Sequence, residues 1–229
     1  MAFSGLPNIF SDLVMIELIN ADCMDIMKKY PDKHFDLAIV DPPYGLDSRL
    51  STGSGKHKNS KFRLQYEKKD WDKIPDENYF KELFRVSKNQ IIWGSNYFIL
   101  PPSRGVICWD KKQMMPTFSR WELAWTSFDK PAKMIELLST DIYRIHPTQK
   151  PVALYRWILD NYTKPNDLIL DTHAGSFSSA VACKKKGFSG VFIELDSDYF
   201  RDGKRRVDKT NRQYDLIKPD KKEPEQLSL

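Results

Sequence analysis

A chain of 229 residues, of which 41% are hydrophobic, is long enough for one compact domain with a sizeable core and is too apolar to be disordered. The net charge of +5 is compatible with a polyanionic partner but does not indicate one. No apolar run reaches the roughly 18 residues that span a bilayer, and no signal-peptide pattern opens the chain, so we expect a cytoplasmic protein without a membrane partner.

In chain order, short apolar runs alternate with amphipathic stretches. The run 34–40 is continuously apolar and is typical of a central buried strand, whereas 45–75 is polar, basic and rich in glycine, which predicts a long surface loop. The predicted elements are strand 14–19, helix 24–30, strand 34–40, loop 45–75, helix 76–86, strands 89–93, 105–109 and 121–128, helix 151–162, strand 167–171, a helix through 180–183, strand 190–193 and helix 198–213.

This alternation predicts a single Rossmann-like α/β domain over 1–215, with one twisted, mostly parallel sheet covered by helices on both faces. The tail 216–229 is predicted to be disordered. Three polar motifs follow directly after predicted strands, at 41–44, 171–176 and Glu194. Because ligands bind at the carboxyl ends of parallel strands, we expect these motifs to line one crevice.

The tetrapeptide Asp41-Pro42-Pro43-Tyr44 is the most informative of the three motifs. Tandem prolines stiffen the turn, so a carboxylate, a fixed carbonyl and an aromatic ring are held at the edge of the crevice. That trio suits an amino group on a flat aromatic ring, because the two acceptors take its hydrogens while the ring stacks. Such acceptors free the nitrogen lone pair for attack. The alternative is a proline-rich turn with a buried tyrosine.

Two further segments extend the pattern, His-Pro-Thr-Gln-Lys-Pro at 146–151 and Trp-Gly-Ser-Asn-Tyr-Phe at 93–98. In this order, with a glycine-bearing loop near the C-terminus, the chain resembles the β-type amino-methyltransferases of DNA from about residue 14 to about residue 200. The resemblance implies S-adenosylmethionine as cofactor and Asp41, Pro42, Pro43 and Tyr44 as catalytic residues. It also implies double-stranded DNA as substrate, with the target base, most often adenine where Asp comes first, turned out of the duplex.

The resemblance also implies a set of cofactor-binding residues. Glu194 would bind the ribose, Asp22 would face the cofactor adenine or cap the following helix, and Lys150 would lie near the cofactor carboxylate, while His146 and His173 are interpreted as structural. The implied set is Asp22, Cys23, Asp41, His146, Thr148, Gln149, Lys150, Asp171, His173, Ala174, Gly175, Ser176, Glu194 and Leu195.

The sequence departs from the family pattern at Phe177, where a second glycine is expected. Its side chain would either crowd the methionine end of the cofactor or point into helix packing. Two tryptophans on one predicted strand, Trp121 and Trp125, are interpreted as core residues. We interpret Cys23, Cys108 and Cys183 as buried thiols, and we predict no metal site because zinc spacing is absent.

Little of the chain is left to recognise a DNA sequence. The basic loop 45–75 and the segments 111–119 and 129–144 are the candidates, so we expect short or relaxed specificity, or help from a homodimer or a second subunit. The loop carries Arg49, Lys56, Lys58, Lys61, Arg63, Lys68 and Lys69. Three alternatives stay open: cytosine-N4 methylation, an RNA or protein-amide substrate, and an inactive DNA-binding relative. The sequence also leaves open whether a restriction enzyme accompanies the protein.

Overall fold

The structure is a computed structural model that describes residues 14–45, 73–113, 119–139, 145–146 and 148–210. Its centre is one eight-stranded sheet with the order β1-β8-β7-β2-β3-β5-β4-β6. Neighbouring strands are parallel except for the two pairs that contain β5. The strands are β1 (Ile16–Asn20), β2 (Phe35–Val40), β3 (Ser87–Trp93), β4 (Val106–Asp110), β5 (Trp121–Thr126), β6 (Lys133–Glu136), β7 (Ile169–Asp171) and β8 (Gly190–Glu194).

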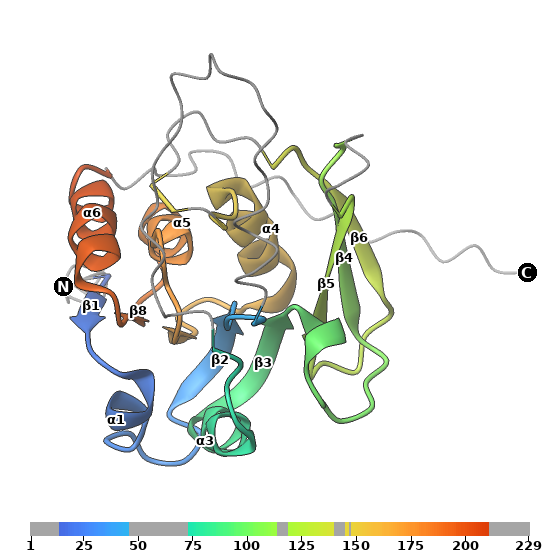
Figure 1. The fold of residues 1–229 in the computed structure, drawn as a ribbon, viewed down its shortest axis with the longest axis horizontal. Coiled ribbons are helices and arrows are strands. Elements are labelled where there is room, and N and C mark those ends of the chain that lie inside the picture. Colours follow the sequence, from blue (N-terminus) through green and yellow to red (C-terminus); the bar gives the residue numbers. More distant parts are fainter. Residues whose placement is uncertain (1–13, 46–72, 114–118, 140–144, 147, 211–229) are drawn as a thin grey trace, which may run out of the picture.

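Helices cover both faces of this sheet (Figure 1). On one side are α4 (Val152–Tyr162), α5 (Ser178–Lys186) and α6 (Ser197–Asp208); on the other are α1 (Cys23–Met27) and α3 (Glu77–Val86). A short 3₁₀ helix, η1 (Ser95–Tyr97), follows β3. The predicted fold class, a mostly parallel α/β sheet with helices on both faces, is therefore confirmed.

Strand β2 explains why the sheet must be covered twice. Leu37 and Ile39 belong to the cluster packed under α4 and α5, whereas Ala38 and Val40 belong to the cluster packed under α1 and α3. Successive side chains of a strand point to opposite faces, so a continuous apolar run fills two cores at once. Both neighbours of β2, strands β3 and β7, are parallel to it, which brings their carboxyl ends to one edge.

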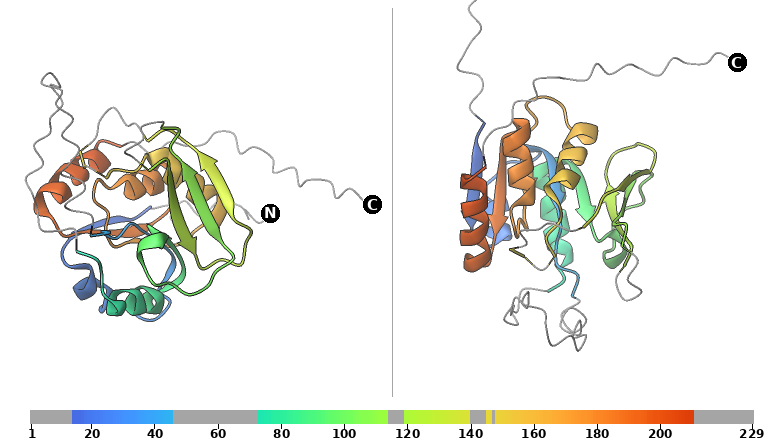
Figure 2. Two further views of the ribbon diagram at one scale, coloured as in Figure 1. Left: turned by 45° about the vertical axis from the view of Figure 1, so that its right-hand side comes forward. Right: turned by 90° about the horizontal axis from the view of Figure 1, so that it is seen from above.

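Strand β6 lies within the segment 129–144, which the sequence leaves without a predicted element. It pairs in parallel with β4 and forms one edge of the sheet, far from α6 at the opposite end (Figure 2). Helices α1 and α6 end earlier than expected, at Met27 and Asp208.

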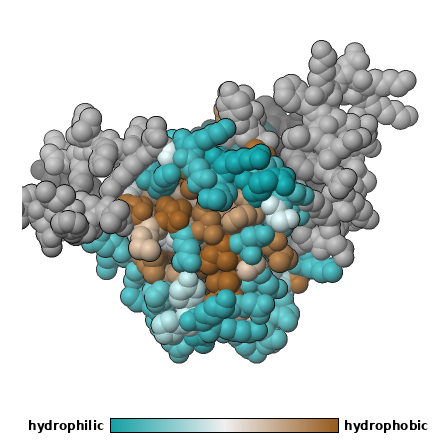
Figure 3. All heavy atoms as spheres, turned by 90° about the vertical axis from the view of Figure 1, so that its left-hand side faces the viewer, coloured by the Kyte–Doolittle hydropathy of each residue, from teal (hydrophilic) through white to brown (hydrophobic). Residues whose placement is uncertain are grey.

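At the β1 edge, hydrophobic surface lies between polar areas (Figure 3), and Met15 there is 70% exposed.

Several predictions fall outside the described residues. These are the basic loop with Arg49 to Lys69, the centre of 111–119, residues 140–144 and the tail 216–229. Of the cysteines, Cys183 is buried, but Cys23 and Cys108 are only partly buried, so the prediction of three buried thiols is wrong for two of them. No helix in the described ranges is long and apolar enough to cross a membrane.

Candidate active site

A large pocket opens at the carboxyl ends of β1, β2, β7 and β8. Its volume of about 1460 Å³ exceeds the roughly 300–1,000 Å³ of a typical one-ligand site. The structure brings these predicted site residues onto the pocket wall: Asp22, Cys23, Asp41, Pro42, Pro43, Tyr44, His146, Thr148, Gln149, Lys150, His173, Ala174, Gly175, Ser176, Glu194 and Leu195. The polar motifs of five separate segments thus converge on one space.

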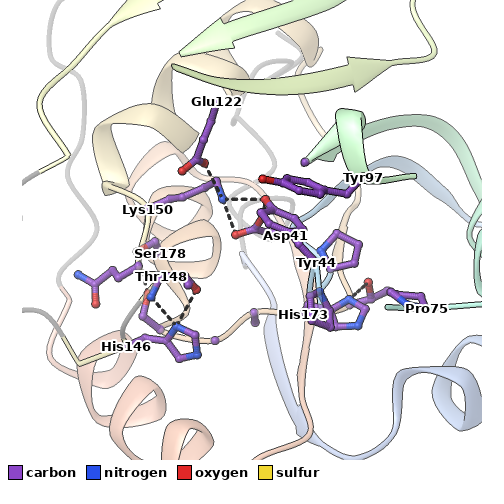
Figure 4. A pocket seen from close by; sticks show the side chains of 18 of the residues that line it. Asp41, Tyr44, Pro75, Tyr97, Glu122, His146, Thr148, Lys150, His173 and Ser178 are labelled. Carbon is purple, nitrogen blue, oxygen red and sulfur yellow. Dashed lines mark hydrogen bonds and ion pairs between the residues drawn. The ribbon is translucent and has the colours of Figure 1, made fainter. Parts of the chain in front are cut away.

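Tyr44 is fixed beside Asp41. Its hydroxyl donates a short hydrogen bond to Asp41 Oδ1, and its ring stacks on Tyr97 with centroids 4.7 Å apart and planes inclined by 11° (Figure 4). Burial and the neighbouring carboxylate of Asp41 raise the pKa of Tyr44, so the phenol stays a donor. Gly94 permits this placement, since a Cβ there would lie 2.2 Å from Tyr44 Cε1.

The Lys150 ammonium lies at Asp41, and its ion-pair partners are protein carboxylates. It is 2.5 Å from Asp41 Oδ2 and 3.1 Å from Glu122 Oε2, and its side chain is 4% exposed. Burial alone disfavours the charged form, but the two carboxylates outweigh it and raise the pKa of Lys150. The structure thus places Lys150 in an ion pair with the candidate catalytic Asp41, and its contact with the cofactor carboxylate stays a prediction.

Glu122 is the site residue that the sequence analysis missed. It sits on β5 with its side chain toward the pocket, 2.5 Å from the ammonium of Lys111 and within ion-pair distance of Lys150. Burial would raise the pKa of Glu122, yet the two lysines lower it, so the carboxylate is charged. A lone acid on an alternating strand carries no motif, and only the fold shows which face it occupies.

Trp121, the neighbour of Glu122, corrects another expectation. The prediction that it belongs to the core is wrong, because it is 56% exposed and lines the pocket mouth. Trp125 does pack against the smaller cluster, with its indole N–H donated to the Pro101 carbonyl at 2.7 Å. The two tryptophans differ in burial because of their positions on β5. Trp125 pairs with buried Ile92 on β3, whereas Trp121 is the first residue of the strand.

At the other end of the pocket, the Glu194 side chain is hydrogen-bonded to the loop after β7. Glu194 Oε2 accepts the Gly175 N–H at 2.7 Å, and Oε1 accepts the Asp196 N–H at 2.8 Å. Burial raises the pKa of Glu194 even though these two N–H groups favour its charged form. Asn20 completes the end by donating to the carbonyls of Glu194 and Leu195, which joins the tips of β1 and β8.

Asp171 lies beneath the pocket wall and is 2% exposed. It accepts hydrogen bonds from the Ser179 hydroxyl at 2.5 Å and from the His173 N–H at 3.1 Å. Burial raises the pKa of Asp171 to about 7. Of the predicted cofactor-binding residues, Asp171 alone does not line the pocket, and its hydrogen bonds support the loop from below.

The two histidines and Asp22 have protein partners. His146 packs edge-on against Tyr199 at 4.3 Å and lies 3.1 Å from the Thr148 hydroxyl. His173 lies 2.9 Å from the Thr172 hydroxyl, and burial lowers its pKa to about 4, so the ring is neutral. Asp22 caps α1 by accepting the Met24 N–H at 2.7 Å while also lining the pocket.

Phe177 points away from the pocket. It is fully buried with φ of 57° and packs against Phe200 at 5.8 Å, over Gly203, where a Cβ would lie 2.2 Å from the Phe177 ring. Of the two expectations, helix packing is confirmed and crowding of the pocket is wrong. The left-handed backbone explains why a glycine would also suit this position.

Comparisons with known proteins agree on one family. The family model described as DNA methylase matches residues 92–205. The DNA adenine methyltransferase YhdJ of Escherichia coli strain K12 is 41% identical over 68 residues, 30% of this chain and 23% of that protein. The type II methyltransferase M2.LlaDCHI of Lactococcus lactis subsp. cremoris is 24% identical over 244 aligned positions, covering 84% of this chain and 89% of that protein.

Two solved structures are similar in fold. The M1.HpyAVI–SAM complex has a TM-score of 0.54 at 24% identity, covering 84% of this chain and 100% of that one. The PvuII DNA methyltransferase, described as cytosine-N4-specific, has a TM-score of 0.56 at 11% identity, covering 84% of this chain and 87% of that one.

Among the residues that the structure describes, no group of three or more metal-ligating side chains is present.

Proposed function

Because the chain belongs to the DNA amino-methyltransferase family, we propose that it transfers a methyl group from S-adenosylmethionine to the 6-amino group of adenine in double-stranded DNA. The observation that carries this proposal is the placement of Asp41 and Tyr44. A half-buried, ion-paired carboxylate and an aromatic ring packed against Gly94 share one wall of a pocket large enough for two ligands.

Residues at the Glu194 end fit the cofactor. The Glu194 carboxylate ends a strand, where it can accept ribose hydroxyls, and the small residues 174–176 let a ligand approach the backbone closely. Asp22 lines the same end and would face the adenine. When bound, S-adenosylmethionine supplies the electrophilic methyl of its sulfonium.

Residues at the Asp41 end would hold and activate the target base. The amino group donates one hydrogen to Asp41 and the other to the Pro42 carbonyl, and the base stacks on Tyr44. Asp41 Oδ1 accepts from Tyr44 and Oδ2 from Lys150, so an incoming amino group takes over one of these positions. The protein thereby orients the nitrogen for in-line attack, and the surplus proton leaves to Asp41 or to water. The amino group is paired in the duplex, so the base has to be extruded first.

The choice of adenine rests on Asp at the first position of the tetrapeptide and on the relative named as an adenine methyltransferase. Cytosine-N4 methylation is the second candidate, since both bases present an exocyclic amino group beside a ring nitrogen acceptor. The fold is shared with an enzyme described as cytosine-N4-specific, so the fold does not separate the two.

Transfer of radiolabelled methyl from S-adenosylmethionine to unmethylated duplex DNA tests the proposal, with digestion of the product to nucleosides. We expect label in 6-methyladenosine from the wild type and none from Asp41→Ala. Label in 4-methylcytosine would keep the mechanism and replace the base. Absence of label from DNA, with the cofactor still bound in calorimetry, would overturn the proposal in favour of an RNA or protein substrate.

A further inference from the structure

Beyond the family motifs, four charged side chains of alternating sign run from the end of β4 to Asp41. Lys111 contacts Glu122 at 2.5 Å, Glu122 contacts Lys150 at 3.1 Å, and Lys150 contacts Asp41 at 2.5 Å (Figure 4 shows the last two). These side chains are shielded from solvent, with exposures of 12%, 25%, 4% and 16% from Lys111 to Asp41. Shielded ion pairs are screened weakly, so their geometry is strongly held.

Lys150 is the centre of this arrangement. Its ammonium donates hydrogen bonds to Asp41 Oδ2 and, at 3.5 Å, to the Tyr44 hydroxyl, and it forms an ion pair with Glu122 Oε2. The rings of Trp93 and Tyr44 lie 5.3 Å and 5.9 Å from its nitrogen, within range of cation–π attraction. These contacts hold the ammonium at the Oδ2 side of Asp41.

The ion pair with Glu122 stabilises the charged Lys150 side chain beside Asp41. A fully buried ammonium with a single carboxylate partner is costly, and a second carboxylate offsets part of its desolvation. Since Glu122 comes from β5 and Lys150 from the segment before α4, their pairing depends on tertiary structure alone. Glu122 Oε2 is buried and accepts no hydrogen bond within the described part of the chain, so the Lys150 ammonium 3.1 Å away compensates its charge as an ion-pair partner.

We propose that Glu122 is a positioning residue for methyl transfer, acting through Lys150 to hold the Asp41 carboxylate in the orientation that receives the base amino group. The inference rests on the proposed function. It assigns Lys150 a place in the acceptor site for the base rather than in the cofactor site, and it adds a residue from outside all the motifs.

The experiment is a double-mutant cycle read in single-turnover methyl transfer, with Glu122→Gln, Lys150→Met and the double variant. Gln retains the size and one acceptor oxygen but not the charge. We expect Glu122→Gln to lower the rate about 10- to 100-fold, comparable to or below the loss of one preorganised electrostatic group. The dissociation constants for cofactor and DNA should change by less than about 3-fold, because neither ligand is bound through Glu122.

Coupling is the decisive readout. If Glu122 acts through Lys150, the same Glu→Gln change should cost less than about 2-fold once Lys150 is Met. Glu122→Asp, which keeps the charge, should retain more activity than Glu122→Gln. Asp36→Asn is the matched control: it removes a carboxylate that pairs with Lys88 at 2.6 Å, near the opposite ends of β2 and β3, and should leave the rate unchanged.

Three results separate the outcomes. A rate for folded Glu122→Gln within about 2-fold of wild type would overturn the inference, and so would an equal loss in the Lys150→Met background, which would mark an effect independent of Lys150. If Glu122→Gln fails to fold, Glu122→Asp in both backgrounds supplies the same test. Failure of the wild type to label DNA would instead overturn the proposed function itself.

Discussion

At the Asp41 end of the pocket, carboxylates face ammonium groups, whereas at the Glu194 end they face backbone N–H groups. Asp41 and Glu122 share Lys150, and the lysines lower the pKa of Glu122. Glu194 accepts the N–H groups of Gly175 and Asp196, and burial raises its pKa. At the Asp41 end, the ion pairs hold charged side chains in place. At the Glu194 end, the hydrogen bonds of the carboxylate hold the backbone of the neighbouring loops in place.

This difference matches the two tasks of a methyl transfer. Positive charge passes to the amino nitrogen during attack, so held negative charge near Asp41 lowers the barrier. A ribose needs acceptors at defined positions and a close backbone, which a carboxylate pinned by N–H groups provides. We therefore expect substitutions at the Asp41 end to reduce the rate of methyl transfer. Substitutions at the Glu194 end should reduce the affinity for the cofactor or the free energy of unfolding.

The largest effect is expected at Asp41. Asp41→Asn removes the charge that receives the amino hydrogen and leaves Lys150 with one carboxylate fewer, so the single-turnover rate should fall about 1,000-fold, the scale of one key electrostatic group. Calorimetry should find the cofactor dissociation constant within about 3-fold of wild type. A large loss of cofactor affinity in this variant would contradict the division between the two ends.

Phe177 tests how the Glu194 end is supported. Phe177→Ala empties the space over Gly203 and should cost about 3 kcal/mol of unfolding free energy in a denaturant titration. Phe177→Gly should cost about 1 kcal/mol less than that, because glycine adopts the left-handed backbone without strain. In either variant, cofactor affinity well below the unfolding temperature should be retained, since the ring points away from the pocket; a matching loss of affinity would show that the loop depends on this packing.

Glu194 should separate binding from chemistry. Glu194→Gln places an amide NH₂ where one carboxylate oxygen accepts an N–H, so calorimetry should show the cofactor dissociation constant rising about 30-fold, as for loss of a charged hydrogen bond. At saturating cofactor the transfer rate should be nearly that of wild type. A fall in rate as large as that of Asp41→Asn would show that Glu194 takes part in the transfer step and not only in cofactor binding.

The smallest expected effect is a pH dependence at His173. Its folded pKa of about 4 lies below the ordinary value of 6.5, so the unfolded chain binds the proton more tightly and stability is lost as pH falls from about 6.5 toward 4. His173→Gln should remove about 2 kcal/mol of this loss between pH 7 and pH 5, measured by thermal unfolding without cofactor. Asp171, with a pKa raised to about 7, has the opposite sign, but it is present in both proteins and cancels in the difference. Equal acid sensitivity in both would contradict the assignment.

Prediction from sequence succeeded where a local pattern implied a spatial relation. The apolar run before Asp41 predicts a central strand, and parallel strands bring Asp41, Gly175 and Glu194 to one edge, as the structure places them. It failed where a local pattern is weak. Strand β6 has four residues, Lys-Met-Ile-Glu, with half-buried and exposed positions alternating, and only its pairing with β4 makes it a strand.

The α/β class, the pocket edge and the family can be predicted from the sequence, because strand periodicity and the spacing of stiff turns are local properties of the chain. The remaining features arise only when distant segments pack together. Tertiary structure paired Lys150 with Asp41 and Glu122, placed Asp171 beneath the loop and turned Phe177 into the notch at Gly203. Each of these depends on which side chains of distant segments share a buried space, and the cost of an unpaired buried charge or an empty cavity is set only when those segments pack together.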